Sequence, residues 1–210
     1  MMFPRNKLKL VILISNAGRG TNLEAIINGV KNGKIKADIS AVISDKTNAP
    51  ALEHARKNNL KIEICPQKEA LLPFLQKLNP DYICLAGWKQ IILNEVIDAF
   101  PERILNTHPG LIPDTLKGVV KNPDGTDALW NKGKMTDKAM QNFLDNHATY
   151  AGCSNHFLTH IFDFGPVLGR CFEKIEPNDS VESLYARLKK KENKLYVEVL
   201  GKLTKANAGK

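Results

Sequence analysis

Apolar and polar positions alternate along the first half of the chain in a way that predicts strands and helices in turn. Residues 8–14 (LKLVILI) form a nearly continuous apolar run, which is typical of a strand covered on both faces. Residues 22–30 follow, with apolar side chains at helical spacing on one face. The alternation continues and predicts strands at 8–14, 39–43, 60–64, 82–86 and 103–106, and helices at 22–30, 50–57, 69–78 and 93–100. This β-α-β-α order indicates a parallel sheet flanked by helices.

The pattern changes after Pro113. Residues 114–134 are rich in Gly, Asn, Asp and Lys, with a single Trp among them. Further along, the sequence predicts a helix at 136–144, strands at 149–158 and 167–175, and a final helix from about 180 to 203. We therefore expect an α/β fold: an open, mostly parallel, twisted sheet flanked by helices, with a C-terminal β-hairpin region and a long final helix.

The composition of the chain argues against several classes of protein. The chain has 210 residues, 43% of them hydrophobic and 25% charged, which is ordinary for a soluble globular protein with one well-filled core. Its apolar runs are too short to span a bilayer, and the N-terminus lacks the pattern of a signal peptide, so we expect a cytoplasmic protein without a membrane partner. The four cysteines are widely spaced without a C-x-x-C pair, which predicts reduced thiols, not a disulfide framework or a zinc site.

The net charge of +8 raises the question of nucleic-acid binding. The basic residues are spread along the chain, and the one dense run, 189–191, falls in a helical pattern that predicts a solvated face. Aromatic residues make up 7% of the chain and do not interleave with the lysines, as a stacking platform for single strands requires. We therefore predict no nucleic-acid partner. The net charge has two remaining explanations: the basic surface attracts small anionic substrates, or it serves solubility alone.

Ligands of parallel α/β sheets bind beyond the carboxyl ends of the strands, so the loops there are informative. The loop at 15–22 (SNAGRGTN) has two glycines just before a helix N-terminus, which suits an anion. It matches neither G-x-G-x-x-G nor a P-loop, because no lysine follows the second glycine. A flexible β-α turn is an equally good interpretation of this loop.

Another loop carries an amide and an imidazole two residues apart, in the stretch 103–113 (RILNTHPGLIP). Residues i and i+2 of an extended chain project to the same side, so Asn106 and His108 point together, and Pro109 favours that conformation. Asn can polarise a carbonyl, and His can accept or donate a proton near neutral pH. Asp163, in the turn 163–166 (DFGP), would orient such a histidine if it lay beside it. Ordinary strand-end and turn hydrogen bonding is the alternative for these residues.

These motifs occur in an order that resembles a known family. The segments 14–26 (ISNAGRGTNLEAI), 85–88 (LAGW), 104–113 (ILNTHPGLIP) and 156–166 (HFLTHIFDFGP) are similar to those of the phosphoribosylglycinamide formyltransferases of purine biosynthesis. The combination of Asn-x-His-Pro with Asp-x-Gly-Pro is specific to the folate-dependent formyltransferase superfamily. The resemblance covers residues 7–200 and implies a single domain over 1–210 with a Rossmann-like formyltransferase fold. Its nucleotide-binding-like half would span 8–106 and its folate and catalytic half 107–203, with a long connection at 114–152.

The resemblance also implies an activity and a site. The activity is transfer of a formyl group from the co-substrate 10-formyltetrahydrofolate to the amine of glycinamide ribonucleotide, without a metal, by a monomer or homodimer. The implied catalytic residues are Asn106, His108 and Asp163, and Glu192 would bind the substrate ribose. The loop that holds the substrate phosphate corresponds to Asn16, Ala17, Gly18, Arg19, Gly20, Thr21 and Asn22. The folate pocket corresponds to Leu85, Trp88, Lys89, Gln90, Ile91, Ile92, Thr159, His160, Ile161 and Phe162.

Two departures from the family pattern bear on this site. Lys89 and Gln90 stand where family members usually carry an arginine near the pterin wall, so folate contacts there are in doubt. The connection at 114–152 is longer than usual and carries Trp130, which suggests a lid that presses onto a bound ligand. A static surface insertion is the alternative.

The remaining histidines show no convincing metal-ligand spacing. We expect His54 on a helix surface, His160 in a loop, and His156 as a structural strand residue near the site.

Other functions can be separated from this one. The main rival enzyme is a folate-dependent N-formyltransferase that acts on an amino-sugar nucleotide. Methionyl-tRNA formyltransferases add a C-terminal domain and formyltetrahydrofolate hydrolases usually carry an N-terminal regulatory domain, and we expect neither in 210 residues whose first strand begins at residue 8. From another class, a basic nucleotide- or RNA-binding domain would explain the charge but not the Asn, His and Asp set.

Overall fold

A computed structural model describes residues 7–15 and 18–207. The chain divides into two compact units: the first holds the residues up to Leu105 and from Tyr196 onward, and the second holds Asn106–Leu195. Strand β5 (Ile104–His108) and the final helix α6 (Val181–Asn207) each contribute residues to both units.

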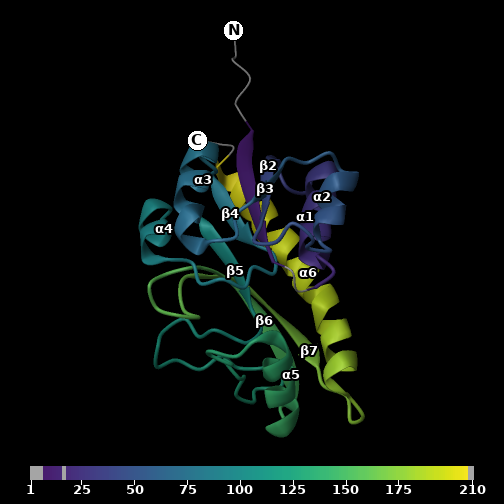
Figure 1. The fold of residues 1–210 in the computed structure, drawn as a ribbon. Coiled ribbons are helices and arrows are strands. Elements are labelled where there is room, and N and C mark those ends of the chain that lie inside the picture. The colour runs from purple at the N-terminus through teal and green to yellow at the C-terminus, as the bar shows by residue number, and fades with distance from the viewer. Residues whose placement is uncertain (1–6, 16–17, 208–210) are drawn as a thin grey trace. The chain divides into compact units, whose positions relative to one another are not determined.

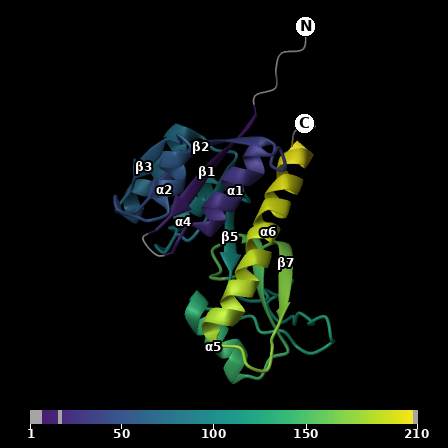
Figure 2. The same ribbon diagram turned by 90° about the vertical axis from the view of Figure 1, so that its right-hand side faces the viewer.

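The first unit is built on five strands in the order β3-β2-β1-β4-β5, and all neighbouring pairs are parallel (Figure 1). Helices α1 and α2 lie on one side of these strands, and α3 and α4 lie on the other (Figure 1, Figure 2). The elements, besides β5, are β1 (Leu8–Ile14), α1 (Thr21–Lys31), β2 (Ala37–Ser44), α2 (Leu52–Lys57), β3 (Ile62–Ile64), the 3-10 turn Lys68–Ala70, α3 (Leu71–Leu78), β4 (Tyr82–Leu85) and α4 (Asn94–Ala99).

Strand β1 forms the centre of this unit because it is apolar on both faces. Every residue from Leu10 to Ile14 is fully buried. The last part of α6 adds Tyr196, whose buried hydroxyl lies 3.2 Å from the carbonyl oxygens of both Leu85 and Leu105. The carboxyl end of β4 and the adjacent part of β5 are thus fixed by the same side chain.

The second unit holds the end of β5, helix α5 (Thr136–Asp145), strands β6 (Tyr150–Phe157) and β7 (Val167–Lys174), and the first part of α6. The strand order continues as β5-β6-β7, and β6 and β7 form an antiparallel pair. The segment between β5 and α5 consists of turns and one isolated bridge between Lys121 and Asp127. The core of this unit is one cluster of buried residues: Leu111, Ala139, Met140, Phe143, Ala151, Leu184 and Leu188.

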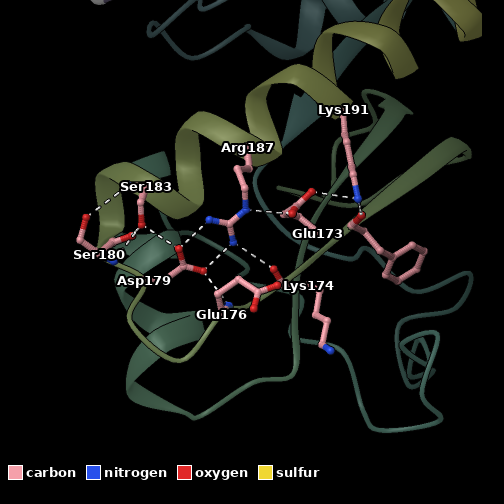
Figure 3. A network of polar contacts seen from close by, with 9 residues as sticks. Glu173, Lys174, Glu176, Asp179, Ser180, Ser183, Arg187 and Lys191 are labelled. Atoms are coloured by element: carbon pink, nitrogen blue, oxygen red, sulfur yellow. Dashed lines mark hydrogen bonds and ion pairs between the residues drawn. The ribbon is translucent and has the colours of Figure 1, made fainter.

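A charged network ties the start of α6 to β7 (Figure 3). Arg187 donates to both carboxylate oxygens of Asp179 at 2.6 Å and to Glu173 at 3.0 Å. One turn further along the helix, Lys191 pairs with Glu173 at 2.8 Å. The hydrogen bonds from the Arg187 guanidinium hold the pKa of Asp179 below its usual range, against the effect of burial.

The predicted fold is confirmed: a mostly parallel sheet flanked by helices, a C-terminal hairpin and a long final helix. The ends of the elements differ from those predicted by a few residues, and α6 ends at Asn207, beyond the expected 203. None of the helices in the described ranges is long and apolar enough to cross a membrane.

Candidate active site

His108 lies at the end of β5 and is almost fully buried, with an exposed fraction of 2%. The chain turns directly after it, and the N–H of Gly110 donates to the His108 carbonyl at 2.9 Å. A side chain at position 110 would place its Cβ 1.9 Å from the carbonyl oxygen of Trp130, so only glycine fits there. This close approach brings the segment around Trp130 directly onto the end of β5.

The imidazole of His108 is held at both of its nitrogens. Nδ1 lies 3.3 Å from Oδ1 of Asp163, and Nε2 lies 2.7 Å from the backbone carbonyl oxygen of Trp130. A carbonyl oxygen can only accept, so Nε2 carries the hydrogen and donates to Trp130. Nδ1 faces the Asp163 carboxylate, so a hydrogen on this nitrogen would also have an acceptor.

Asp163 follows β6 in a turn, with a backbone φ of 51° in the left-handed region that Asp tolerates. Its Oδ2 accepts a hydrogen bond from the N–H of Gly133 at 2.7 Å. Burial raises the pKa of this carboxyl, but the hydrogen bond and charge of His108 and the N–H of Gly133 together outweigh burial and lower the pKa. Asp163 is thus an anion that favours the imidazolium form of His108 and fixes the orientation of its ring.

Asn106 is oriented by a buried histidine on β6. Its amide nitrogen lies 3.2 Å from Nε2 of His156, whose Nδ1 lies 3.0 Å from the carbonyl oxygen of Phe157. That carbonyl can only accept, so Nδ1 carries the hydrogen and Nε2 accepts from the Asn106 amide. Burial, assisted by the charge of His108, lowers the pKa of His156 to about 4, so its ring is neutral near pH 7. The second N–H of the Asn106 amide is the group that can donate to a substrate oxygen.

Trp130 covers this cluster with both its backbone and its side chain. Its indole N–H donates to the backbone carbonyl of Asp163 at 3.0 Å, and its ring lies 5.8 Å from the ring of Phe164. The ammonium of Lys132 lies over the indole, 5.0 Å from the ring centroid. Because Nε2 of His108 is hydrogen-bonded to the Trp130 carbonyl, a substrate oxygen can bind this nitrogen only after the segment around Trp130 has moved.

The predicted phosphate loop belongs to the first unit. Asn16 and Ala17 lie outside the described residues, and Gly18 to Asn22 lead directly into α1. Gly20 has a φ of 73°, and a Cβ there would lie 2.5 Å from the Cβ of Ala51, so the loop depends on glycine at this position. The carbonyl of Arg19 lies 2.9 Å from Nε2 of His54. His54 is therefore not the simple surface residue that we expected, because its ring contacts the loop.

The first group of predicted folate residues, 85–92, also lies in the first unit, at and beyond the end of β4. The N–H of Lys89 donates to the Ser15 hydroxyl at 3.0 Å, and the Gln90 amide donates to the Pro66 carbonyl at 3.1 Å. The Ile91 side chain is 64% exposed. The Ile91 side chain is therefore exposed on a segment that these two hydrogen bonds hold in place.

The second group, 159–162, lies in the second unit, just before Asp163. The Thr159 hydroxyl donates to the Phe164 carbonyl at 2.7 Å and closes this turn. His160 is exposed in a loop, as predicted, and Ile161 and Phe162 are 42% and 61% exposed. These exposed apolar side chains next to an ionised carboxyl resemble the wall of a ligand pocket more than a packed core.

Glu192 on α6 is buried, although its sequence context of lysines and Asn predicts a surface residue. Its carboxylate lies 2.5 Å from the ammonium of Lys189. Burial lowers the pKa of Lys189, but the charges of Glu192 and Tyr185 and the hydrogen bond to Glu192 together outweigh burial and raise it. The prediction that the run 189–191 forms a solvated face is therefore wrong for Lys189, because this lysine turns inward to pair with Glu192.

Some of the groups that position the side chains of the site could not be predicted from the sequence. The Trp130 carbonyl and the Gly133 N–H are backbone atoms, and His156 was expected only as a structural residue. No local pattern marks these contacts, since each joins segments that are far apart in the chain. Within residues 7–15 and 18–207, no group of three or more His, Cys, Asp or Glu side chains is arranged to hold a metal ion.

The fold and this cluster define a class of protein. It is an α/β protein with an amide donor, an imidazole and a carboxylate gathered at the end of a strand, an arrangement suited to acyl-type group transfer. The family described as formyl transferase matches residues 8–200 of the chain. The chain belongs to this family, and the family assignment made from the sequence is confirmed.

Individual relatives agree with this assignment. A phosphoribosylglycinamide formyltransferase of Escherichia coli is 32% identical over 203 residues, covering 92% of this chain and 85% of the relative. A chloroplastic enzyme of the same name from Arabidopsis thaliana is 31% identical over 208 residues, covering 94% of this chain and 65% of the relative. A glycinamide ribonucleotide transformylase of known structure from Symbiobacterium toebii has a TM-score of 0.82 at 30% identity, covering 98% and 92% of the two chains. The chain thus spans just under two thirds of the length of the Arabidopsis relative.

Proposed function

We propose that the protein transfers a formyl group from 10-formyltetrahydrofolate to the amine of glycinamide ribonucleotide. The relatives from Escherichia coli, Arabidopsis thaliana and Symbiobacterium toebii carry names that state this acceptor. The observation that carries the proposal is the pairing of His108 with Asp163 at 3.3 Å, beside an Asn106 amide oriented by His156. This cluster supplies the hydrogen-bond donors and the acid that formyl transfer needs.

The first step needs stabilisation of negative charge. When the acceptor amine attacks the formyl carbon, the formyl oxygen becomes negative. The Asn106 amide and the His108 imidazolium both donate hydrogen bonds to that oxygen, each worth about 3–4 kcal/mol if it resembles known oxyanion holes. The Trp130 carbonyl, which accepts from Nε2 of His108 at 2.7 Å, must first move away so that the formyl oxygen can bind there.

The second step needs a proton transfer. The attacking nitrogen loses a proton, and the leaving nitrogen of the folate gains one. As an imidazolium, His108 donates a proton to the leaving nitrogen and then, as a neutral imidazole, takes up the proton that the attacking nitrogen loses, while Asp163 keeps the ring in place. Positioned acids and bases of this kind contribute about 10²–10⁴-fold in rate. A water held by Asp163 is the alternative carrier.

The other predicted contacts complete the proposal. The loop Gly18–Asn22 binds the acceptor phosphate through backbone amides at the start of α1, and Glu192 binds the ribose. Residues 85–92 and residues 159–162 each contribute contacts to the folate, without the arginine that family members usually carry near the pterin. A cytoplasmic location, a monomer or homodimer, and the lack of a metal, nucleic-acid or membrane partner stay predictions.

One assay separates the candidate functions. The pure protein is incubated with 10-formyltetrahydrofolate and one acceptor, and release of tetrahydrofolate is followed. Release with glycinamide ribonucleotide supports the proposal, whereas release only with an amino-sugar nucleotide supports the rival transferase. A salt-dependent gel shift with RNA, without any formyl transfer at fixed salt, would instead favour a binding domain.

A further inference from the structure

Two cysteines face each other across the β6–β7 hairpin. Cys153 and Cys171 are directly paired in the antiparallel register, and their Sγ atoms lie 3.0 Å apart. All four cysteines are free thiols, and neither Cys65 nor Cys84 pairs with another cysteine in the described part of the chain. The strands predicted at 149–158 and 167–175 each carry one member of this pair, but only the register of the hairpin shows that the two lie opposite each other.

The backbone already suits a bond between these thiols. Residues directly opposite in an antiparallel pair have Cα atoms about 4.5–5.5 Å apart. Disulfides span Cα separations of about 4.4–6.8 Å. A bond between Cys153 and Cys171 therefore needs only small side-chain rotations, and the strands keep their register.

The two thiols are not equivalent. Cys153 is fully buried, whereas Cys171 is half-buried on β7, the last strand in the sheet order. The hydrogen bond from Cys153 lowers the pKa of Cys171, against the effect of burial. The same hydrogen bond, together with burial, raises the pKa of Cys153. Cys171 is thus the more accessible thiol and the one that ionises first.

Charged side chains of α6 surround the pair. The ammonium of Lys191 is fixed beside β7, since it donates to the carbonyl of Phe172 at 2.7 Å and pairs with Glu173 at 2.8 Å (Figure 3). The charge of Glu192 opposes the thiolate of Cys171, and the charge of Lys191 favours it to a smaller extent. The hydrogen bond from Cys153 is therefore the main group that favours ionisation of Cys171.

We propose that Cys153 and Cys171 form a thiol–disulfide exchange site that reacts with small disulfides of the glutathione class. The Cys171 thiolate attacks one sulfur of the small disulfide, whose S–S bond breaks and releases one thiolate. Cys153 then loses its proton and attacks Sγ of Cys171 in the mixed disulfide, and the second small thiolate leaves. In total, the two protein thiols are oxidised to a disulfide and the small disulfide is reduced to two thiols.

The exchange site does not depend on the proposed formyl transfer, because none of its steps uses Asn106, His108 or Asp163. It does lie next to a contact that shapes the turn after β5. Ser154 follows Cys153, and its hydroxyl donates to the Gly110 carbonyl at 2.8 Å and accepts from the Ile112 N–H at 2.9 Å. Oxidation would therefore stiffen the hairpin that holds this turn.

The test uses the whole wild-type chain and oxidised glutathione. We expect the intact mass to fall by two hydrogen atoms and digestion to yield a linked pair of peptides that contain Cys153 and Cys171. The oxidised protein should melt roughly 5 °C higher, because a cross-link constrains the unfolded chain, and dithiothreitol should reverse both changes. A Cys65→Ala variant is the matched control and should behave like the wild type. Full retention of four thiols over a wide range of glutathione ratios would overturn the proposal.

The order of attack is tested with single variants. In Cys153→Ala the mixed disulfide should persist on Cys171, because the resolving thiol is gone. In Cys171→Ala no adduct should form at Cys153 at a comparable rate. If either variant fails to fold, alkylation of the wild type by iodoacetamide reports the same order, and Cys171 should react at least tenfold faster than Cys153. Faster reaction at Cys153 would contradict the assignment of roles.

Discussion

The loops after β1 and β5 provide their chemistry in different ways. After β1, the candidate binding groups are backbone amides, because Gly20 adopts a φ of 73° and leads into the N-terminus of α1. After β5, it offers side chains, and His108 is held by Trp130 and Asp163 from segments far away in the sequence. The first loop can therefore be assigned from a few adjacent residues, whereas the second works only when distant segments pack together.

This difference predicts how each region fails. Substitutions at the end of β5 should lower kcat and leave substrate affinity unchanged, because we expect these side chains to act on the reacting atoms. Substitutions in the loop after β1 should weaken the binding of one substrate and leave kcat unchanged.

The largest effect is expected from the imidazolium pair. His108→Ala and Asp163→Asn should each lower kcat by about 10²-fold or more, because each removes part of the same proton path. The double variant should lose far less than the sum of the two free-energy changes. Steady-state kinetics on the three variants, beside an exposed-histidine control, His147→Ala, would measure this. Near-wild-type turnover in Asp163→Asn would remove Asp163 from the mechanism.

The next effect concerns the glycine loop. Gly20→Val places a side chain against Ala51, only 2.5 Å from its Cβ, and should raise the KM for the phosphorylated acceptor roughly tenfold while folate affinity holds. Gly125→Val is the matched control, because Gly125 has a φ of 86° with no neighbour within 4 Å of its Cβ. If folate affinity falls and acceptor affinity survives, the two pockets have been assigned the wrong way round.

Burial of His156 on β6, beside Asn106 of β5, gives the stability of the second unit a pH dependence. Its pKa is about 4 in the folded protein, mainly because of burial, against an ordinary value of 6.5. The unfolded chain then binds more protons between these values, so the free energy of unfolding falls as the pH drops through this window. The loss should reach about 2 kcal/mol at pH 5 relative to neutral pH. Urea unfolding of the wild type and His156→Gln should show a smaller loss in the variant, whereas equal losses would place the titration elsewhere.

The fold and the site differ in how far the sequence predicts them. Continuous apolar runs such as 8–14 and the helical spacing of α1 predict the strands, the helices and their order, because those signals are local. The strand predicted at 103–106 ends before His108, whereas β5 continues through His108. The Trp130 carbonyl over His108 has no local signal, since it depends on how a turn-rich segment packs. The inward turn of Lys189 was missed for the same reason.

The smallest expected effect concerns the segment around Trp130. Its indole contacts Asp163 and Phe164 in the free protein, so binding of both substrates should change its environment. In a Trp88→Phe background, we expect a change in Trp130 fluorescence on addition of both substrates. Trypsin should also cut more slowly in the complex, at Lys117, Lys121, Lys132 or Lys134. Unchanged fluorescence and equal cutting would leave this segment as a static insertion.

We propose that the cluster of Asn106, His108 and Asp163 transfers a formyl group to an amine. This transfer is measured by following a labelled formyl group from 10-formyltetrahydrofolate in the presence of glycinamide ribonucleotide. We expect the label to appear on the acceptor amine in step with tetrahydrofolate release, and His108→Ala to abolish both. Label recovered as free formate, or label transferred equally well by His108→Ala, would contradict it.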